Sequence, residues 1–69
     1  MKTKFYILIT GPKYSIKYTA INKPHVAMIN GKVTLRFINA ETDDTTLIIL
    51  ADCDRLEIRN SGKQVVEVF

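Results

Sequence analysis

The dipeptide Asn30-Gly31 constrains the fold more than any other feature of this sequence. A two-residue type I′ turn needs positive φ at both central positions, and asparagine and glycine adopt that conformation at the lowest cost. A chain reversal there sets up three facing pairs, namely Ile29 with Lys32, Met28 with Val33 and Val26 with Leu35. One face of the hairpin then carries Val26, Met28, Val33, Leu35 and Phe37, and the other carries His25, Ala27, Thr34 and Arg36. Because turn chemistry and residue pattern agree on one register, the sequence predicts a β-hairpin here.

Alternation with period two also predicts strands on the amino-terminal side of this hairpin. The run Phe5 to Ile9 is apolar on both faces, which is typical of a central strand. After a break at Gly11-Pro12, a second strand is predicted with two distinct faces: Tyr14, Ile16, Tyr18 and Ala20 on one, and Ser15, Lys17 and Thr19 on the other. Asn22-Lys23-Pro24 ends this strand, because proline removes a ladder donor.

The carboxy-terminal half predicts two or three more strands separated by polar turns. Residues 40–45 form an acidic loop, residues 46–51 are nearly all apolar and predict a buried strand, and Asp52-Cys53-Asp54 predicts a tight turn. Leu56 and Ile58 alternate with charged residues and are expected to point inward. At Asn60-Ser61-Gly62-Lys63 we favour a three-residue loop with a bulge near Gly62, which pairs Ile58 with Val66 and Leu56 with Val68. A two-residue loop would instead set Leu56 against Glu67.

These elements predict one small all-β domain over residues 1–69, built from six or seven short antiparallel strands. We expect a small barrel of the SH3-like or OB-like kind, because a flat sheet would leave one apolar face bare. A small β-sandwich is the alternative. A chain this short buries a limited core, so association with a second subunit would add burial that the single chain lacks.

The sequence argues against catalysis, a metal site and a bound cofactor. It has one histidine, His25, so no His-paired relay can be built within the chain. Cys53 lies between Asp52 and Asp54, whose charges oppose thiolate formation, and a single cysteine allows no internal disulfide. Asp43-Asp44 lies in a loop that lacks the glycine and terminal glutamate of a calcium site. We therefore expect a non-enzyme. With no apolar run long enough for a signal peptide or a membrane span, its expected compartment is the cytoplasm.

Charge is divided unevenly along the chain. Residues 1–40 contain seven lysine and arginine side chains and no acidic one, whereas residues 41–69 contain seven acidic and three basic side chains. Two functions are consistent with this distribution of charge. The first is a non-enzymatic protein-interaction module, self-assembling or modulating a larger complex. The second is a small barrel that binds single-stranded DNA or RNA through the basic residues of 1–40.

Each function has its own candidate residues. Contacts to nucleic acid or to an acidic partner are predicted at Lys13, Tyr14, Lys17, Tyr18, Lys23, His25, Lys32 and Arg36. Tyr14 and Tyr18 lie on the opposite face of their strand from Lys17, which weighs against a single binding surface. A subunit interface of a homo-oligomer is predicted at Val65, Val66, Val68 and Phe69, where a carboxy-terminal edge strand could pair with a second copy. We favour the protein partner over nucleic acid.

Overall fold

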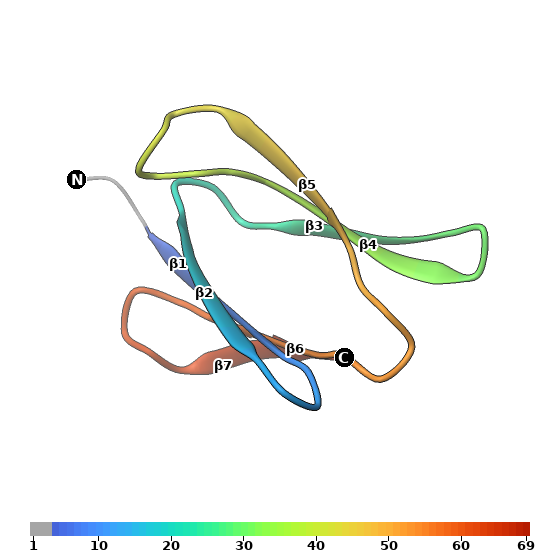
Figure 1. Ribbon diagram of the computed structural model, residues 1–69. Helices are drawn as coiled ribbons and strands as arrows, with labels where there is room; N and C mark the ends of the chain where they lie inside the picture. Colours follow the sequence, from blue (N-terminus) through green and yellow to red (C-terminus); the bar gives the residue numbers. More distant parts are fainter. Residues whose placement is uncertain (1–3) are drawn as a thin grey trace.

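The computed structural model describes residues 4–69, which form seven antiparallel strands and no helix (Figure 1). In chain order the strands are β1 (Phe5–Thr10), β2 (Ser15–Ala20), β3 (His25–Ile29), β4 (Lys32–Ile38), β5 (Thr45–Ile49), β6 (Arg55–Arg59) and β7 (Val65–Val68). The predicted all-β class is therefore confirmed. No helix long and apolar enough to cross a membrane occurs in this part of the chain.

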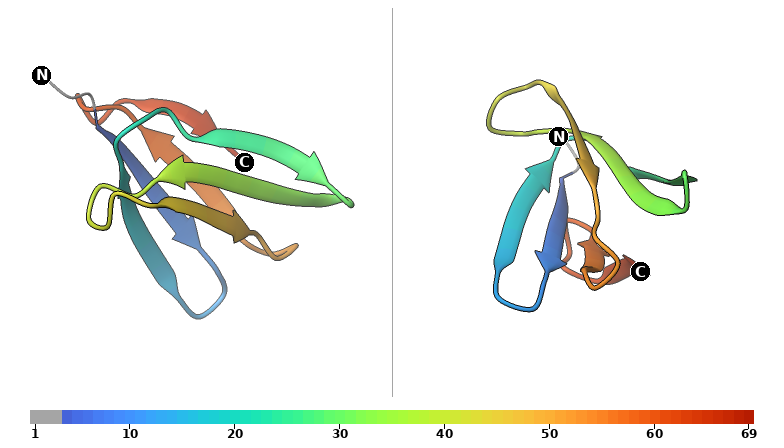
Figure 2. Two further views of the ribbon diagram at one scale, coloured as in Figure 1. Left: turned by 90° about the horizontal axis from the view of Figure 1, so that it is seen from above. Right: turned by 45° about the vertical axis from the view of Figure 1, so that its right-hand side comes forward.

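The strands form two sheets that pack face to face and cross at an angle (Figure 2). One sheet has four strands in the order β2-β1-β6-β7, and the other has three strands in the order β3-β4-β5. As predicted, β1 is a central strand, with β2 on one side and β6 on the other. Hydrogen bonds do not close residues 4–69 into a barrel, so the arrangement fits the predicted sandwich or an open barrel.

One corner ties the two sheets together where β2 ends. The Ile21 amide donates to the Ile38 carbonyl at 3.0 Å, and the Ala40 amide donates to the Thr19 carbonyl at 2.8 Å. Ala20, between these bonds, is completely buried, and its small side chain leaves room for the close approach of β4. The end of β2 and the start of the β4–β5 loop are therefore held side by side.

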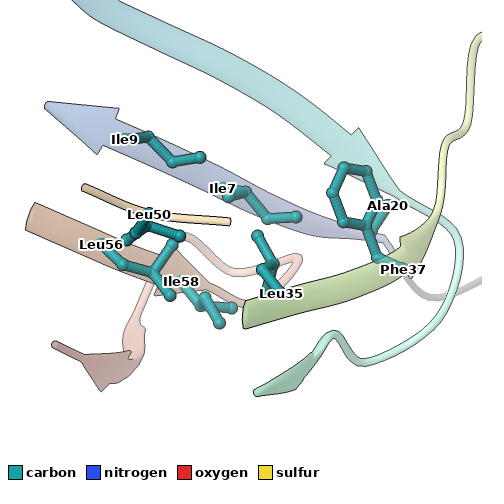
Figure 3. Close-up of a cluster of buried hydrophobic side chains, with 8 residues drawn as sticks. All are labelled: Ile7, Ile9, Ala20, Leu35, Phe37, Leu50, Leu56 and Ile58. Atoms are coloured by element: carbon teal, nitrogen blue, oxygen red, sulfur yellow. The ribbon is translucent and has the colours of Figure 1, made fainter. Parts of the chain in front are cut away.

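The core lies between the sheets and is drawn from both of them (Figure 3). Its buried members are Ile7, Ile9, Ala20, Leu35, Phe37, Leu50, Leu56 and Ile58. Full burial of one such aliphatic or aromatic side chain stabilises the fold by about 1.5–3 kcal/mol relative to leaving it exposed. The inward orientation predicted for Leu56 and Ile58 is confirmed.

The hairpin predicted at Asn30-Gly31 is confirmed in every pair. Asn30 has φ of 53° and Gly31 has φ of 75°, as a type I′ turn requires. Ile29 pairs with Lys32, and the remaining pairs of β3 and β4 follow in the predicted register. The turn and the side-chain pattern thus fix the same alignment.

Two predictions about the carboxy-terminal half are wrong. The strand predicted over residues 46–51 is not buried on both faces, because β5 is an edge strand whose outer face stays open to solvent. The predicted three-residue loop Ser61-Gly62-Lys63 is present, but the bulge predicted near Gly62 lies at Val66, within β7.

The predicted pairing of the last two strands is also corrected. Val65 faces Arg59, as the three-residue loop requires. A bulge then leaves Val66 unpaired and shifts the register by one residue. Ile58 therefore faces Glu67 instead of Val66. The backbone of Leu56 then pairs with Phe69 instead of Val68, at N–O distances of 2.8 and 3.0 Å. The alternation therefore turns Glu67 toward the inner side of the sheet and Val68 toward the outer side.

Candidate functional site

Three exposed aliphatic side chains, Ile29, Leu47 and Ile49, lie on the outer side of the three-stranded sheet. The register places Ile49 opposite Thr34 and Thr34 opposite Ala27, so these three residues form one row across β5, β4 and β3. Leu47 and Ile29 belong to the rows on either side. We call the four apolar residues Ala27, Ile29, Leu47 and Ile49 the apolar outer face.

The exposure of this face is large for aliphatic side chains. Leu47 and Ile49 are each 62% exposed, and Ile29 is 53% exposed. Thr34 forms the floor between them at 5% exposure, because neighbouring side chains surround it. Contiguous exposed apolar surface of this kind is a feature of interaction sites.

The charges around the apolar outer face are arranged by sign. The three basic residues His25, Lys32 and Arg36 lie on the same side of the sheet, on β3 and β4. The acidic residues lie beyond the two ends of β5: Glu41, Asp43 and Asp44 in the preceding loop, and Asp52 and Asp54 in the following turn. The strand β5 itself carries no charge.

The residues predicted to contact nucleic acid do not form one surface. Lys17 lies on the outer side of the four-stranded sheet, whereas His25, Lys32 and Arg36 lie on the outer side of the other sheet. Tyr18 faces inward and packs against Phe37, with ring centroids 5.5 Å apart. Lys13 lies in the β1–β2 turn, and Lys23 approaches Glu67 at 3.8 Å. The structure therefore separates this set over the outer faces of both sheets, two turns and the rim of the core.

Tyr14 is held by a polar contact between two distant turns. Its hydroxyl donates a hydrogen bond to the carboxylate of Asp54, which also accepts a bond of 3.0 Å from the Ala51 amide. Because ionisation of Tyr14 would destroy the bond to Asp54, this contact raises the pKa of Tyr14 to about 12, with smaller contributions from burial and from the charge of Asp54. The ring also lies against Gly11. Tyr14 therefore links two turns through its hydroxyl, while its side chain stays 43% exposed.

A second candidate site is an open hollow of about 380 Å³ on the outer side of the four-stranded sheet. Its lining includes Tyr6 and Leu8 from β1, Lys17 from β2, Arg59 from β6 and Lys63 from the last turn. Arg59 is fixed in place, because its Nε contacts Glu57 and its Nη1 donates to the Lys63 carbonyl at 2.8 Å. The hollow combines an aromatic ring with three cations and one carboxylate.

The residues predicted to form a subunit interface lie at the free edge of the four-stranded sheet. Val65, Val66, Val68 and Phe69 are all between 43% and 56% exposed. The bulge at Val65 and Val66 makes this edge irregular, however, and Glu67 faces inward beside it. Bulges and inward charges protect an edge from pairing with another chain.

Among residues 4–69, which the structure describes, no group of three or more potential metal ligands comes together, and Cys53 is a free, exposed thiol. His25 lies exposed on β3 opposite Arg36, with no acid or nucleophile paired to it across the ladder.

Sequence reasoning missed Leu47 and Ile49, because a strand that is apolar on both faces looks the same whether it is central or at an edge. It also missed Tyr6, Arg59 and Lys63, which come together only through the pairing of β1 with β6. Comparison with known protein families, curated proteins and solved structures found no significant match.

Proposed function

We propose that this protein is a non-enzymatic protein-interaction module that binds a partner protein through its apolar outer face. The observation that carries the proposal is the exposure of Leu47 and Ile49, at 62% each, on an uncharged edge strand. Covering such side chains removes apolar surface from water, which is the dominant favourable term in most protein association. The separation of the basic residues over two faces supports the same choice, since no single phosphate-tracking surface unites them.

The proposed module needs no cofactor and no metal. The scattered positions of His25, Cys53 and the acidic residues support a binding role over a catalytic one. The cytoplasm remains the expected compartment, because a free thiol with no disulfide partner is ordinary in a reducing environment.

Affinity capture with matched surface variants tests this function. The double variant Leu47→Ser with Ile49→Ser removes the most exposed part of the apolar outer face and should keep the fold, because both side chains point into solvent. The control is Val65→Ser with Val68→Ser, which removes comparable apolar surface at the other sheet. We expect cross-linking capture from the cells that encode the protein to yield a partner that the control retains and the first variant loses. Equal capture by both variants would refute the proposal.

Self-association through β7 stays a prediction alongside this function. Light scattering over a wide concentration range measures it directly. If Val65, Val66, Val68 and Phe69 form a subunit contact, Val68→Lys should shift the mass toward that of one chain, because a charge would be buried at the interface. A protein that remains a single chain at high concentration would contradict the prediction.

Nucleic acid is the second candidate, and the hollow lined by Tyr6, Lys17, Arg59 and Lys63 favours it. Aromatic rings beside cations bind single strands by stacking and by phosphate attraction. Binding of labelled single-stranded DNA and RNA at several salt concentrations tests this function. We expect Lys17→Glu with Lys63→Glu to flatten the salt dependence, because each lost phosphate contact lowers the slope by about 0.7 on single strands. No binding at low salt would exclude this candidate.

A further inference from the structure

The free edge of β5 is the most regular unpaired edge among the described strands. Only β4 lies along β5. At one end of their ladder the Leu50 amide donates to the Val33 carbonyl, and at the other end the Asn39 amide donates to the Asp44 carbonyl, each at 2.9 Å. Paired and unpaired positions alternate along an antiparallel ladder. The N–H and C=O groups of Thr45, Leu47 and Ile49 therefore point away from β4.

The other three edges carry the features by which proteins block pairing with a further strand. On β2, Lys17 is at the edge, and the Thr19 carbonyl already accepts a bond from Ala40. The edge of β3 follows Pro24 and begins with His25. The edge of β7 has a bulge and the inward-facing Glu67. By contrast, β5 has no proline, no charge and no bulge.

The place beside β5 is also left uncovered by the fold. The loop before β5 contacts the end of β2 through Ala40 and Thr19, and the turn after β5 contacts the start of β2 through Asp54 and Tyr14. Between these two contacts no strand of the three-stranded sheet covers the inner side of β2, and Ile16 there is 40% exposed although its partner Ile9 is buried (Figure 2). One more strand on β5 would make both sheets four-stranded and would lie over Ile16.

A second copy of β5 does not suit this place. Pairing two copies antiparallel about Leu47 would bring Asp43 and Asp44 of one chain close to Asp52 of the other. Like charges beside a ladder oppose pairing. The same acidic residues attract a strand that has basic residues at both of its ends.

We propose that β5 binds an extended peptide segment by antiparallel strand addition, and that this segment has an apolar centre flanked by lysine or arginine. The inference rests on the proposed protein-interaction function and names its binding mode and its ligand class. Backbone bonds to Thr45, Leu47 and Ile49 supply the affinity in this mode, and side chains opposite them extend the apolar outer face. The basic flanks meet Asp43 and Asp44 at one end and Asp52 at the other.

Synthetic peptides test the mode on the unaltered protein. The probe is Lys-Lys-Val-Ile-Val-Thr-Val-Lys-Lys, whose valines fall opposite Ile49, Leu47 and Thr45. In this register the valine N–H groups point toward β5, and the N–H groups of the intervening isoleucine and threonine point away. We expect N-methylation of the valine nitrogens to weaken binding at least about tenfold. N-methylation of the isoleucine and threonine nitrogens should leave the affinity within about threefold.

Charge and protein variants complete the test. The same peptide with glutamate in place of each lysine should not bind, and added salt should weaken the lysine form. On the protein, Leu47→Pro should weaken binding of the lysine probe further than Leu47→Thr does. Both variants remove the leucine side chain from the apolar outer face, but only proline also removes the N–H that points away from β4.

Three outcomes would overturn the inference: equal binding of the two methylated peptides, equal binding of the glutamate form, or no binding of the lysine probe at millimolar concentration. If the probe fails while the Leu47→Ser and Ile49→Ser double variant still loses its captured partner, the interaction function stands and strand addition is wrong. If the probe binds as expected while both double variants capture the same proteins, β5 binds extended peptides, but the captured partner does not use the apolar outer face.

Discussion

Replacement of Gly31 separates the cost of backbone conformation from the cost of packing. The residue has φ of 75°, and a Cβ placed on it would meet no atom within 4 Å. A side chain at this position therefore strains only the backbone. A left-handed conformation costs a residue with a Cβ about 1–2 kcal/mol, and a β-branched residue lies at or above the upper end of that range.

The expected loss can be stated as a change in melting temperature. For a domain of this size, 1 kcal/mol corresponds to a shift in Tm of about 4–8 °C. We therefore expect Gly31→Ala to lower Tm by about 4–8 °C and Gly31→Val by about 8–16 °C. The turn closes the β3–β4 hairpin, so the whole loss should appear in the cooperative transition.

Thermal unfolding followed by far-ultraviolet circular dichroism measures these shifts, and Gly62→Ala is the matched control. Gly62 does not have positive φ, and the nearest atom to a Cβ at this position would be Asn60 Oδ1 at 3.4 Å. Alanine there should be neutral or stabilise by about 0.4–1 kcal/mol, because it restricts the unfolded chain. An unchanged Tm for Gly31→Val, or an equal loss for Gly62→Ala, would show that the type I′ turn does not limit stability.

Three further predictions concern side chains. The pKa of Tyr14 rises from its ordinary value of 10.0 to about 12 on folding. The bond to Asp54 should therefore stabilise the fold fully below about pH 10, and this stabilisation should be lost between pH 10 and 12. Ultraviolet titration of Asp54→Asn should show the pKa of Tyr14 returning toward 10. Tyr18→Ala should cost about 3 kcal/mol in urea unfolding, because its ring packs on Phe37, whereas Tyr14→Ala should cost clearly less. Equal costs would contradict the inward position of Tyr18. Lys63→Gly should stabilise by up to about 1 kcal/mol in the same assay, because Lys63 has φ of 62°, and a loss of stability would refute backbone strain there.

The sequence by itself determined the strands and one register. Period-two alternation marks strands from local residue order alone, and Asn30-Gly31 fixes both the turn type and the alignment of its neighbours. Inward and outward sides follow wherever one face is apolar and the other polar, as for Leu56 and Ile58. These features depend on contacts between residues close in the chain, so they can be read without the fold.

Sheet order and edges were decided only by the tertiary structure. The strand β5 is apolar on both faces, and that pattern suits a central or an edge position equally, so the exposure of Leu47 could not be foreseen. The register of β7 depends on a bulge that leaves Val66 unpaired. The local residue pattern does not predict which residue is left unpaired. The exposure of β5 and the register of β7 both depend on which strands, distant in the sequence, share a sheet.

The candidate sites follow the same division. The chain's division into a basic and an acidic half is evident from the sequence, yet folding places Lys17 and Arg36 on the outer faces of different sheets and packs Tyr18 against the core. The apolar outer face and the acidic residues at the two ends of β5 arise from strand pairing across three strands. A sequence specifies which residues are apolar or charged, but a surface is defined by neighbours in space, and only the packing of the two sheets brings those neighbours together.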